Sequence, residues 1–234
     1  SDVVDDDPAA IGSGPTVGDT TTVGDARRVL ERAGISRDMP EALEALARAG
    51  ETPKPGDASL AESRFVLIGG RRTAMDGVVE AALALDLATI VFDEPITGDA
   101  AAAGRAFAAR ALAAARRIGG AVVVASGETT VKVSGSGTGG RNQEFALGAA
   151  REIAGLRGVT LAALGTDGVD GNSHAAGAIS DGATIDRAAA LGLDPRDALN
   201  RNDSTSFFGP LGDLMVTGST GTNVGDVFLA MIEP

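Results

Sequence analysis

Three segments rich in glycine and polar residues contain the side chains whose types and spacing could perform chemistry. They are residues 134–144, 165–178 and 217–226, and each follows a short apolar run. A fourth and less distinct segment spans residues 68–74. In open α/β sheets, ligands bind in the loops after the carboxyl ends of the strands. We therefore expect these turns to converge, so that a guanidinium, a carboxylate and backbone amides surround one anion.

The first segment, SGSGTGGRNQE, combines closely spaced glycines with an arginine. Gly135, Gly137 and Gly140 have the G-x-G-x-x-G spacing, with Gly139 beside them. Backbone N–H groups in such a loop bind phosphate together with the N-terminus of the next helix. Gly137, Gly139 and Gly140 are therefore candidate nucleotide-binding residues, with an ordinary tight turn as the alternative. Arg141 begins the expected helix as a candidate catalytic residue that binds phosphate oxygens, and a surface arginine is its alternative.

The second segment places two carboxylates just past an apolar run. Asp167 and Asp170 flank Gly168 and Val169. A carboxylate in that position could hold Mg²⁺ or accept a hydroxyl proton. The alternative is a turn in which the carboxylate accepts a hydrogen bond from its own backbone. His174, the single histidine of the chain, lies in the same polar loop, and we expect it to have a solvated or structural role.

The third segment gathers hydroxyl groups and glycines. Thr220, Gly221, Thr222 and Asn223 could donate hydrogen bonds to phosphate or ribose oxygens. A hairpin-like turn is the alternative interpretation. The chain contains neither the P-loop pattern nor the V-A-I-K pattern of protein kinases. Any nucleotide site must therefore be built in another way.

The elements that position these segments alternate between short apolar strands and helices. The pattern predicts an α/β fold with mostly parallel sheets covered by helices. Gly119 and Gly120 mark an expected boundary between two α/β domains, residues 1–118 and 119–234. Helices are expected at 23–34, 40–50, 71–87, 97–118, 141–157, 182–191 and 203–209. Strands are expected at 65–69, 88–92, 121–125, 129–133, 159–164, 214–218 and 227–232.

Composition excludes several classes of protein. A formal net charge of −12 disfavours nucleic acid and anionic membranes as partners. With no cysteine, the chain has neither a disulfide scaffold nor a thiolate metal site. No apolar run approaches the roughly 18 residues of a membrane span. These features indicate a cytoplasmic protein, and they leave its oligomeric state open, with a homo-oligomer among the alternatives.

Several long motifs resemble a known family, in order along nearly the whole chain. GETTVKVSGSGTGGRNQEFAL, GTDGVDGNSHAAGA, NDSTSFF and GDLMVTGSTGTNVGD are similar to the MOFRL domain, the carboxy-terminal part of class II glycerate 2-kinases. Members of that family often bear the name hydroxypyruvate reductase. SDVVDDDPAAIGSGPTVGD, ETPKPGD and EPITGDA resemble the later part of the family's amino-terminal domain.

The resemblance implies a two-domain α/β enzyme that uses ATP and Mg²⁺ to phosphorylate D-glycerate at the 2-hydroxyl. The family's catalytic arginine falls on Arg141, and its acidic residue falls on Asp167, which is also the candidate metal ligand. The family's lysine would precede residue 1. The chain is therefore expected to be a fragment with a truncated first domain, to be inactive alone, and to be less well packed over residues 1–118.

Two alternatives remain at this point. The first is an NAD(P)H-dependent hydroxypyruvate reductase, which rests on the G-x-G-x-x-G spacing and on the family's other name. The acidic residue expected about 20 positions after that motif has no clean match. The second alternative is an inactive fragment that still binds nucleotide.

Overall fold

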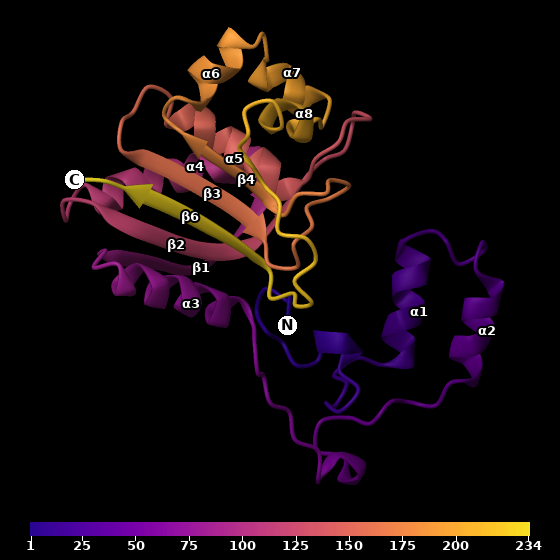
Figure 1. Cartoon of the computed structure of the whole chain (residues 1–234). Helices are drawn as coiled ribbons and strands as arrows, with labels where there is room; N and C mark the ends of the chain where they lie inside the picture. The colour runs from indigo at the N-terminus through magenta and orange to yellow at the C-terminus, as the bar shows by residue number, and fades with distance from the viewer. The chain divides into compact units, whose positions relative to one another are not determined.

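The computed structural model describes residues 1–234 as two compact units, one formed by residues 6–67 and the other by residues 1–5 and 68–234. The larger unit contains one six-stranded sheet in the order β1-β2-β6-β3-β4-β5, with helices on both faces (Figure 1). Its strands are β1 Thr89–Asp99, β2 Ala121–Thr130, β3 Val159–Gly165, β4 Gly177–Asp181, β5 Leu214–Met215 and β6 Asp226–Ile232. Its helices are α3 Arg71–Ala84, α4 Ala100–Ala115, α5 Arg141–Glu152, α6 Thr184–Ala190, α7 Pro195–Asn200 and α8 Ser204–Phe208.

The strand directions differ from the prediction. The α/β class is confirmed, but only β1 and β2 run parallel, and the other four pairings are antiparallel. The last strand of the chain, β6, lies between β2 and β3 and runs against both. Apolar runs buried on both faces suit either direction, so the sequence pattern could not distinguish them. The expectation of mostly parallel sheets is therefore wrong.

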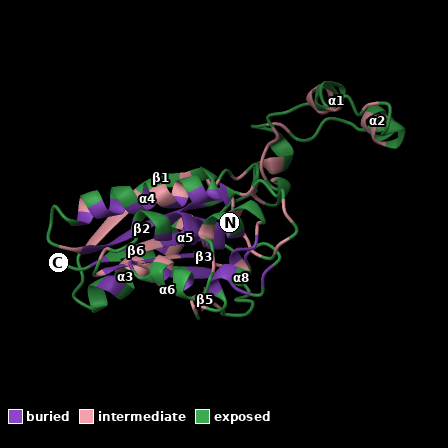
Figure 2. Cartoon of the chain, turned by 90° about the horizontal axis from the view of Figure 1, so that it is seen from above, coloured by how far each residue is buried: buried purple, intermediate pink, exposed green.

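Alternate residues of β2 point to opposite faces of the sheet. Val122 and Val124 pack with Met75 and Ala82 of α3. Val123 and its alternate neighbours join the larger core that includes residues of α4 and α5. Figure 2 shows this buried zone in purple between the sheet and those two helices. The sheet is thus covered by helices on both faces, because each face carries apolar side chains that must be buried.

The α4–α5 contact fixes the helix that carries the candidate arginine. A Cβ atom at Gly104 would overlap the carbonyl oxygen of Phe145, and one at Gly148 would overlap that of Ala101. The two glycines therefore let the helix backbones approach closely. Below them, the rings of Phe145 and Phe228 stack with centroids 4.0 Å apart and planes 9° apart. Backbone contact and aromatic packing together fix α5 against the sheet.

Several predicted boundaries shift for local reasons. Residues 65–69 form no strand, and Val66 and Ile68 are 72% and 93% exposed, because no neighbouring strand pairs with this apolar run. The expected strand at 129–133 is only the end of β2. The helix expected from residue 97 starts at residue 100, because Asp99 caps it by accepting the Ala102 N–H at 2.9 Å. Neither α7 nor β4 was predicted.

The smaller unit contains α1 Val23–Arg32 and α2 Pro40–Arg48, both expected, and the short 3₁₀ helices Ile11–Ser13 and Ala58–Leu60. No residue of 6–67 is buried. The division between the units does not coincide with the predicted boundary at residues 118 and 119. The reason is that β1 pairs with β2, and α4 packs into the larger core with residues of 119–234.

None of the helices has both the length and the apolar character needed to span a membrane.

Candidate active site

The predicted segments meet at one end of the sheet. Asp226, the first residue of β6, pairs with Gly127 of β2 on one side and with Gly165 of β3 on the other. Beside them lies a cavity of about 650 Å³. Arg141 and Asp167, the two candidate catalytic residues, both line this cavity. Two residues 26 positions apart in the sequence thus face one space.

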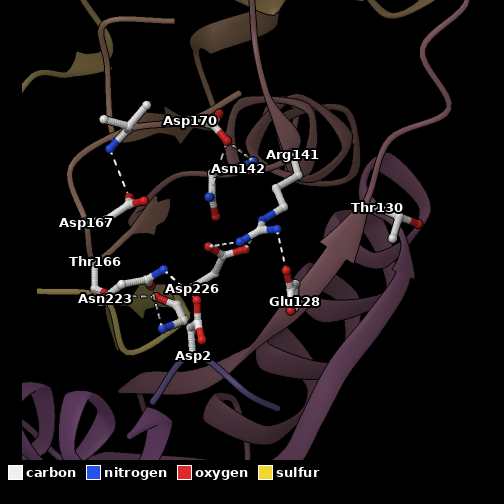
Figure 3. Close-up of polar contacts among 12 residues, drawn as sticks. Asp2, Glu128, Thr130, Arg141, Asn142, Thr166, Asp167, Asp170, Asn223 and Asp226 are labelled. Atoms are coloured by element: carbon white, nitrogen blue, oxygen red, sulfur yellow. Dashed lines mark hydrogen bonds and ion pairs between the residues drawn. The ribbon is translucent and has the colours of Figure 1, made fainter. Parts of the chain in front are cut away.

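Arg141 is held by two carboxylates at the first position of α5 (Figure 3). Its Nε and Nη2 atoms donate to the two oxygens of Asp226 at 2.7 and 3.1 Å, and its Nη1 donates to Glu128 at 2.7 Å. The Asp226 side chain is 2% exposed, whereas that of Glu128 is 45% exposed. A guanidinium has five N–H groups, so two donors remain for a ligand in the cavity.

The start of α5 is fixed by Asp170, which is buried. Its carboxylate accepts the amide N–H groups of Asn142 at 3.0 Å and Gln143 at 2.9 Å. A carboxylate here is favourable because it satisfies free amides at the positive end of the helix dipole. Asp170 is therefore a helix cap contributed by another loop, neither a turn carboxylate nor a free metal ligand. It also occupies the place that a nucleotide phosphate would need at this helix end.

The glycines of the first segment serve close packing. A Cβ at Gly137 would overlap the Asp203 side chain, and one at Gly140 would overlap Asp170. The amides of Gly137 and Gly139 donate to Arg201 O at 3.0 Å and to Asn172 Oδ1 at 2.8 Å. Gly137, Gly139 and Gly140 line the cavity, in a loop whose hydrogen bonds are those of a packed turn. Most of the amides that a phosphate would need already have acceptors.

Asp167 lies in a tight turn with one oxygen free. Its Oδ1 accepts the Val169 N–H at 3.0 Å, and Gly168 between them has a φ of 87°, which favours glycine. The local turn given as the alternative is therefore formed. The second carboxylate oxygen accepts no hydrogen bond from the protein. Asp167 can thus bind a ligand in the cavity while its backbone is held by the turn.

The third segment supports the second one and does not line the cavity. The Thr220 hydroxyl donates to Thr166 O at 2.6 Å, and the Thr220 amide donates to Asp167 O at 3.2 Å. Asn223 Nδ2 donates to Asp2 at 2.9 Å. Thr220, Gly221, Thr222 and Asn223 are all exposed. His174 is exposed as well, in agreement with its expected solvated role.

Sequence reasoning missed four polar residues at this site: Glu128, Glu144, Asn202 and Asp226. Asn202 accepts the amides of Ser134 and Gly135 at 2.8 and 2.9 Å and donates to Glu144 Oε1 at 2.9 Å. It therefore ties the first segment to α5. An acid directly before an apolar strand, as in GTNVGD, was the only signal for Asp226. The partners of these residues lie far away along the chain, so no local pattern identifies them.

Burial raises the pKa of two acids beside the cavity. Desolvation raises the pKa of Asp226, although the hydrogen bonds and charge of Arg141 oppose the shift. Desolvation likewise raises the pKa of Asp170 against the hydrogen bonds from the amides of Asn142 and Gln143. Arg141 is the only cationic residue that lines the cavity, together with three acids, Glu144, Asp167 and Asp170. An anionic ligand would therefore need additional positive charge there.

Glu144 gives this site a testable pH dependence. Burial raises its pKa above the ordinary value of 4.5, and the charges of Asp99 and Asp170 add to the shift, while the hydrogen bond from Asn202 opposes it. Because Glu144 binds its proton more tightly in the folded state, its protonation stabilises the folded protein. This contribution is fully present below pH 4.5 and is lost as the pH rises through the raised pKa. We expect the difference in unfolding free energy between wild type and Glu144→Gln to change with pH in that window, in favour of wild type at lower pH. Urea unfolding at several pH values measures it, and a pH-independent difference would contradict it.

This chain matches two family models and several known proteins. Residues 121–226 match the MOFRL family, and residues 1–48 match a domain of unknown function (DUF4147). A protein of Agrobacterium vitis named "Putative hydroxypyruvate reductase" is 39% identical over 99% of this chain and 53% of its own length. The D-glycerate 2-kinase of Thermotoga maritima is 38% identical over 99% of this chain and 55% of its own length.

Two further similarities extend this result. The glycerate kinase of Macaca fascicularis is 30% identical, and the match covers the whole of this chain and 71% of that relative. A crystal structure of glycerate kinase from Thermotoga maritima matches with a TM-score of 0.86 at 37% identity, over 99% of this chain and 55% of that one. The chain thus spans about half the length of the first curated relatives it matches.

Proposed function

This chain belongs to the glycerate kinase family that contains a MOFRL domain, and on that premise we propose that it supplies the arginine- and carboxylate-bearing part of a site that phosphorylates D-glycerate at the 2-hydroxyl. The observation that carries this proposal is the shared cavity of Arg141 and Asp167. Phosphoryl transfer depends mainly on positioning and on charge stabilisation. A fixed cation and a carboxylate with a free oxygen, facing one space, supply both.

Each residue has a defined role in the proposed reaction. The guanidinium of Arg141 binds oxygens of the transferring phosphoryl group and neutralises their charge. The free oxygen of Asp167 orients Mg²⁺ or accepts the proton of the 2-hydroxyl. Thr220, Gly221, Thr222 and Asn223 are proposed as nucleotide-binding residues, because they are exposed and lie beside the Asp167 turn. Gly137, Gly139 and Gly140 form a wall of the cavity.

The residues present fit ATP with Mg²⁺ as the phosphoryl donor. No group of three or more acidic or histidine side chains could hold a metal ion by protein ligands alone. Kinase sites usually hold Mg²⁺ by one or two carboxylates together with substrate phosphates and water, and Asp167 offers one such carboxylate. The metal ion would also supply the positive charge that this acidic cavity needs beside Arg141.

The geometry disfavours the reductase alternative. In a dinucleotide-binding fold, the pyrophosphate lies at the helix N-terminus that follows the glycine motif. Here the carboxylate of Asp170 already occupies the amides of Asn142 and Gln143 at the start of α5. A second anion at that position would be repelled, so the glycine spacing lends no support to a nicotinamide cofactor.

An assay of the full-length gene product tests the proposal. We expect it to convert ATP and D-glycerate to ADP and 2-phosphoglycerate, identified by ³¹P NMR, with activity lost on chelation of Mg²⁺ by EDTA. The parallel arm measures NADH oxidation with hydroxypyruvate. Turnover in that arm, with none in the first, would replace the kinase proposal with the reductase. Phosphorylation at the 3-hydroxyl would overturn the assigned regiochemistry.

A further inference from the structure

The two acids that bind Arg141 differ in how firmly they are held. Asp226 makes two hydrogen bonds to the guanidinium, and its side chain is 2% exposed. Glu128 makes one hydrogen bond, and its side chain is 45% exposed. Figure 3 shows the two carboxylates on different sides of the guanidinium. One edge of the Arg141 guanidinium is thus bound by the buried Asp226 carboxylate, and another is bound by the partly exposed Glu128 carboxylate.

The position of Asp226 is determined by the centre of the sheet. It begins β6, which pairs on both sides, and its two cross-strand partners are Gly127 and Gly165. A Cβ at Gly165 would lie 3.0 Å from Asp167 Oδ1 and 3.6 Å from Asn142 Nδ2, so a side chain there would intrude on this site. At Gly127 a Cβ would overlap the carbonyl oxygen of Ile96, so both strands beside Asp226 are closely packed. A buried carboxylate without the guanidinium would be strongly unfavourable, so this pair stays together.

The Glu128 carboxylate can separate from Arg141 at little cost in free energy. Exposed ion pairs contribute little to stability, because water solvates both charges when the pair opens. A phosphoryl group or another carboxylate presents oxygens to a guanidinium in the same geometry as Glu128 does. The Nη1 donor that binds Glu128 belongs to a residue that lines the cavity. An incoming oxyanion would therefore compete directly with this carboxylate.

We propose that Asp226 is a positioning residue that holds Arg141 for the reaction, and that Glu128 occupies the place of the substrate oxyanion until that oxyanion displaces it. The proposal deepens the kinase function proposed above and rests on it. The oxyanion is either a phosphoryl group of the nucleotide or the carboxylate of D-glycerate. Because the two acids have opposite roles, their removal should have opposite effects.

NMR of residues 1–234 tests the positioning claim without any turnover. The Nε–Hε resonance of Arg141, assigned by its absence in Arg141→Lys, should be protected from exchange with water in wild type and in Glu128→Gln. It should be exposed to exchange in Asp226→Asn. Persistence of the protected resonance in Asp226→Asn would overturn the proposal. If Asp226→Asn does not fold by circular dichroism, rapid exchange of this resonance in wild type would overturn it instead.

Binding and kinetics test the displacement claim. Inorganic phosphate and D-glycerate are titrated separately, and the one that occupies Arg141 should bind Glu128→Gln about fivefold or more tightly than wild type. In the full-length gene product, Glu128→Gln should lower KM for the matching substrate, whereas Asp226→Asn should lower kcat about 10²-fold. Unchanged dissociation constants for both anions in Glu128→Gln would overturn the proposal.

A wild-type protein that does not phosphorylate D-glycerate would refute the proposed function, while the NMR and titration results would still decide the roles of the two acids.

Discussion

Replacement of Arg141 by alanine is expected to lower the turnover of the full-length protein by about 10³- to 10⁵-fold, because the guanidinium would stabilise charge that develops mainly in the transition state. The same change leaves the Asp226 carboxylate buried and unpaired. We therefore also expect a loss of about 3 kcal/mol in unfolding free energy. Steady-state kinetics and urea unfolding measure the two effects.

A double variant separates the catalytic effect from the structural one. Arg141→Gln combined with Asp226→Asn removes both charges, so no buried carboxylate remains unpaired. We expect this variant to regain most of the lost stability without regaining turnover. Near-normal kcat in Arg141→Ala would contradict the catalytic assignment. Recovery of turnover in the double variant would show that the loss in the single variant came from instability.

Phe145→Ala is expected to lower the unfolding free energy of the larger unit by about 3–5 kcal/mol, because it removes a large side chain from a fully buried position. The ring of Phe145 stacks on Phe228 and lies 5.7 Å from the ring of Phe107. The change therefore leaves a cavity beneath α5, one turn after Arg141. Urea unfolding followed by circular dichroism measures the change.

Phe65 provides the matched control for this substitution. It belongs to the segment expected from the sequence to be a buried strand, yet it is 41% exposed and outside any strand. Phe65 belongs to the smaller unit, so Phe65→Ala should change the unfolding free energy of the larger unit by no more than about 0.5 kcal/mol, as for other surface substitutions. Equal losses at the two positions would mean that residues 65–69 are packed in solution, contrary to the structure.

Local patterns located most of the secondary structure. The runs AVVVA and VTLAAL predicted the core of β2 and most of β3, because apolar β-branched residues favour strands. The run FVLIG has the same character but forms no strand, since a strand needs a partner and none lies beside it. The sequence did not predict β4, which lies in the stretch expected to be a polar loop, because the strand is short and depends on its pairing with β3. Strand direction could not be predicted from the sequence either, because a buried apolar run has the same pattern in a parallel and in an antiparallel strand.

For the site, the sequence by itself determined where Arg141 lies on its helix and that Asp167 follows a strand, because both facts depend on nearest neighbours along the chain. Only the tertiary structure decided what these residues face. Asp170 caps α5 from 28 positions away, and Asp226 binds Arg141 across 85 positions. Such pairs form because burial makes an unpaired charge or amide costly, and burial depends on how the whole sheet assembles. The sequence therefore predicted that Arg141 and Asp167 face one cavity, whereas the distant carboxylates of Asp170 and Asp226 that hold α5 and Arg141 in place could not be predicted.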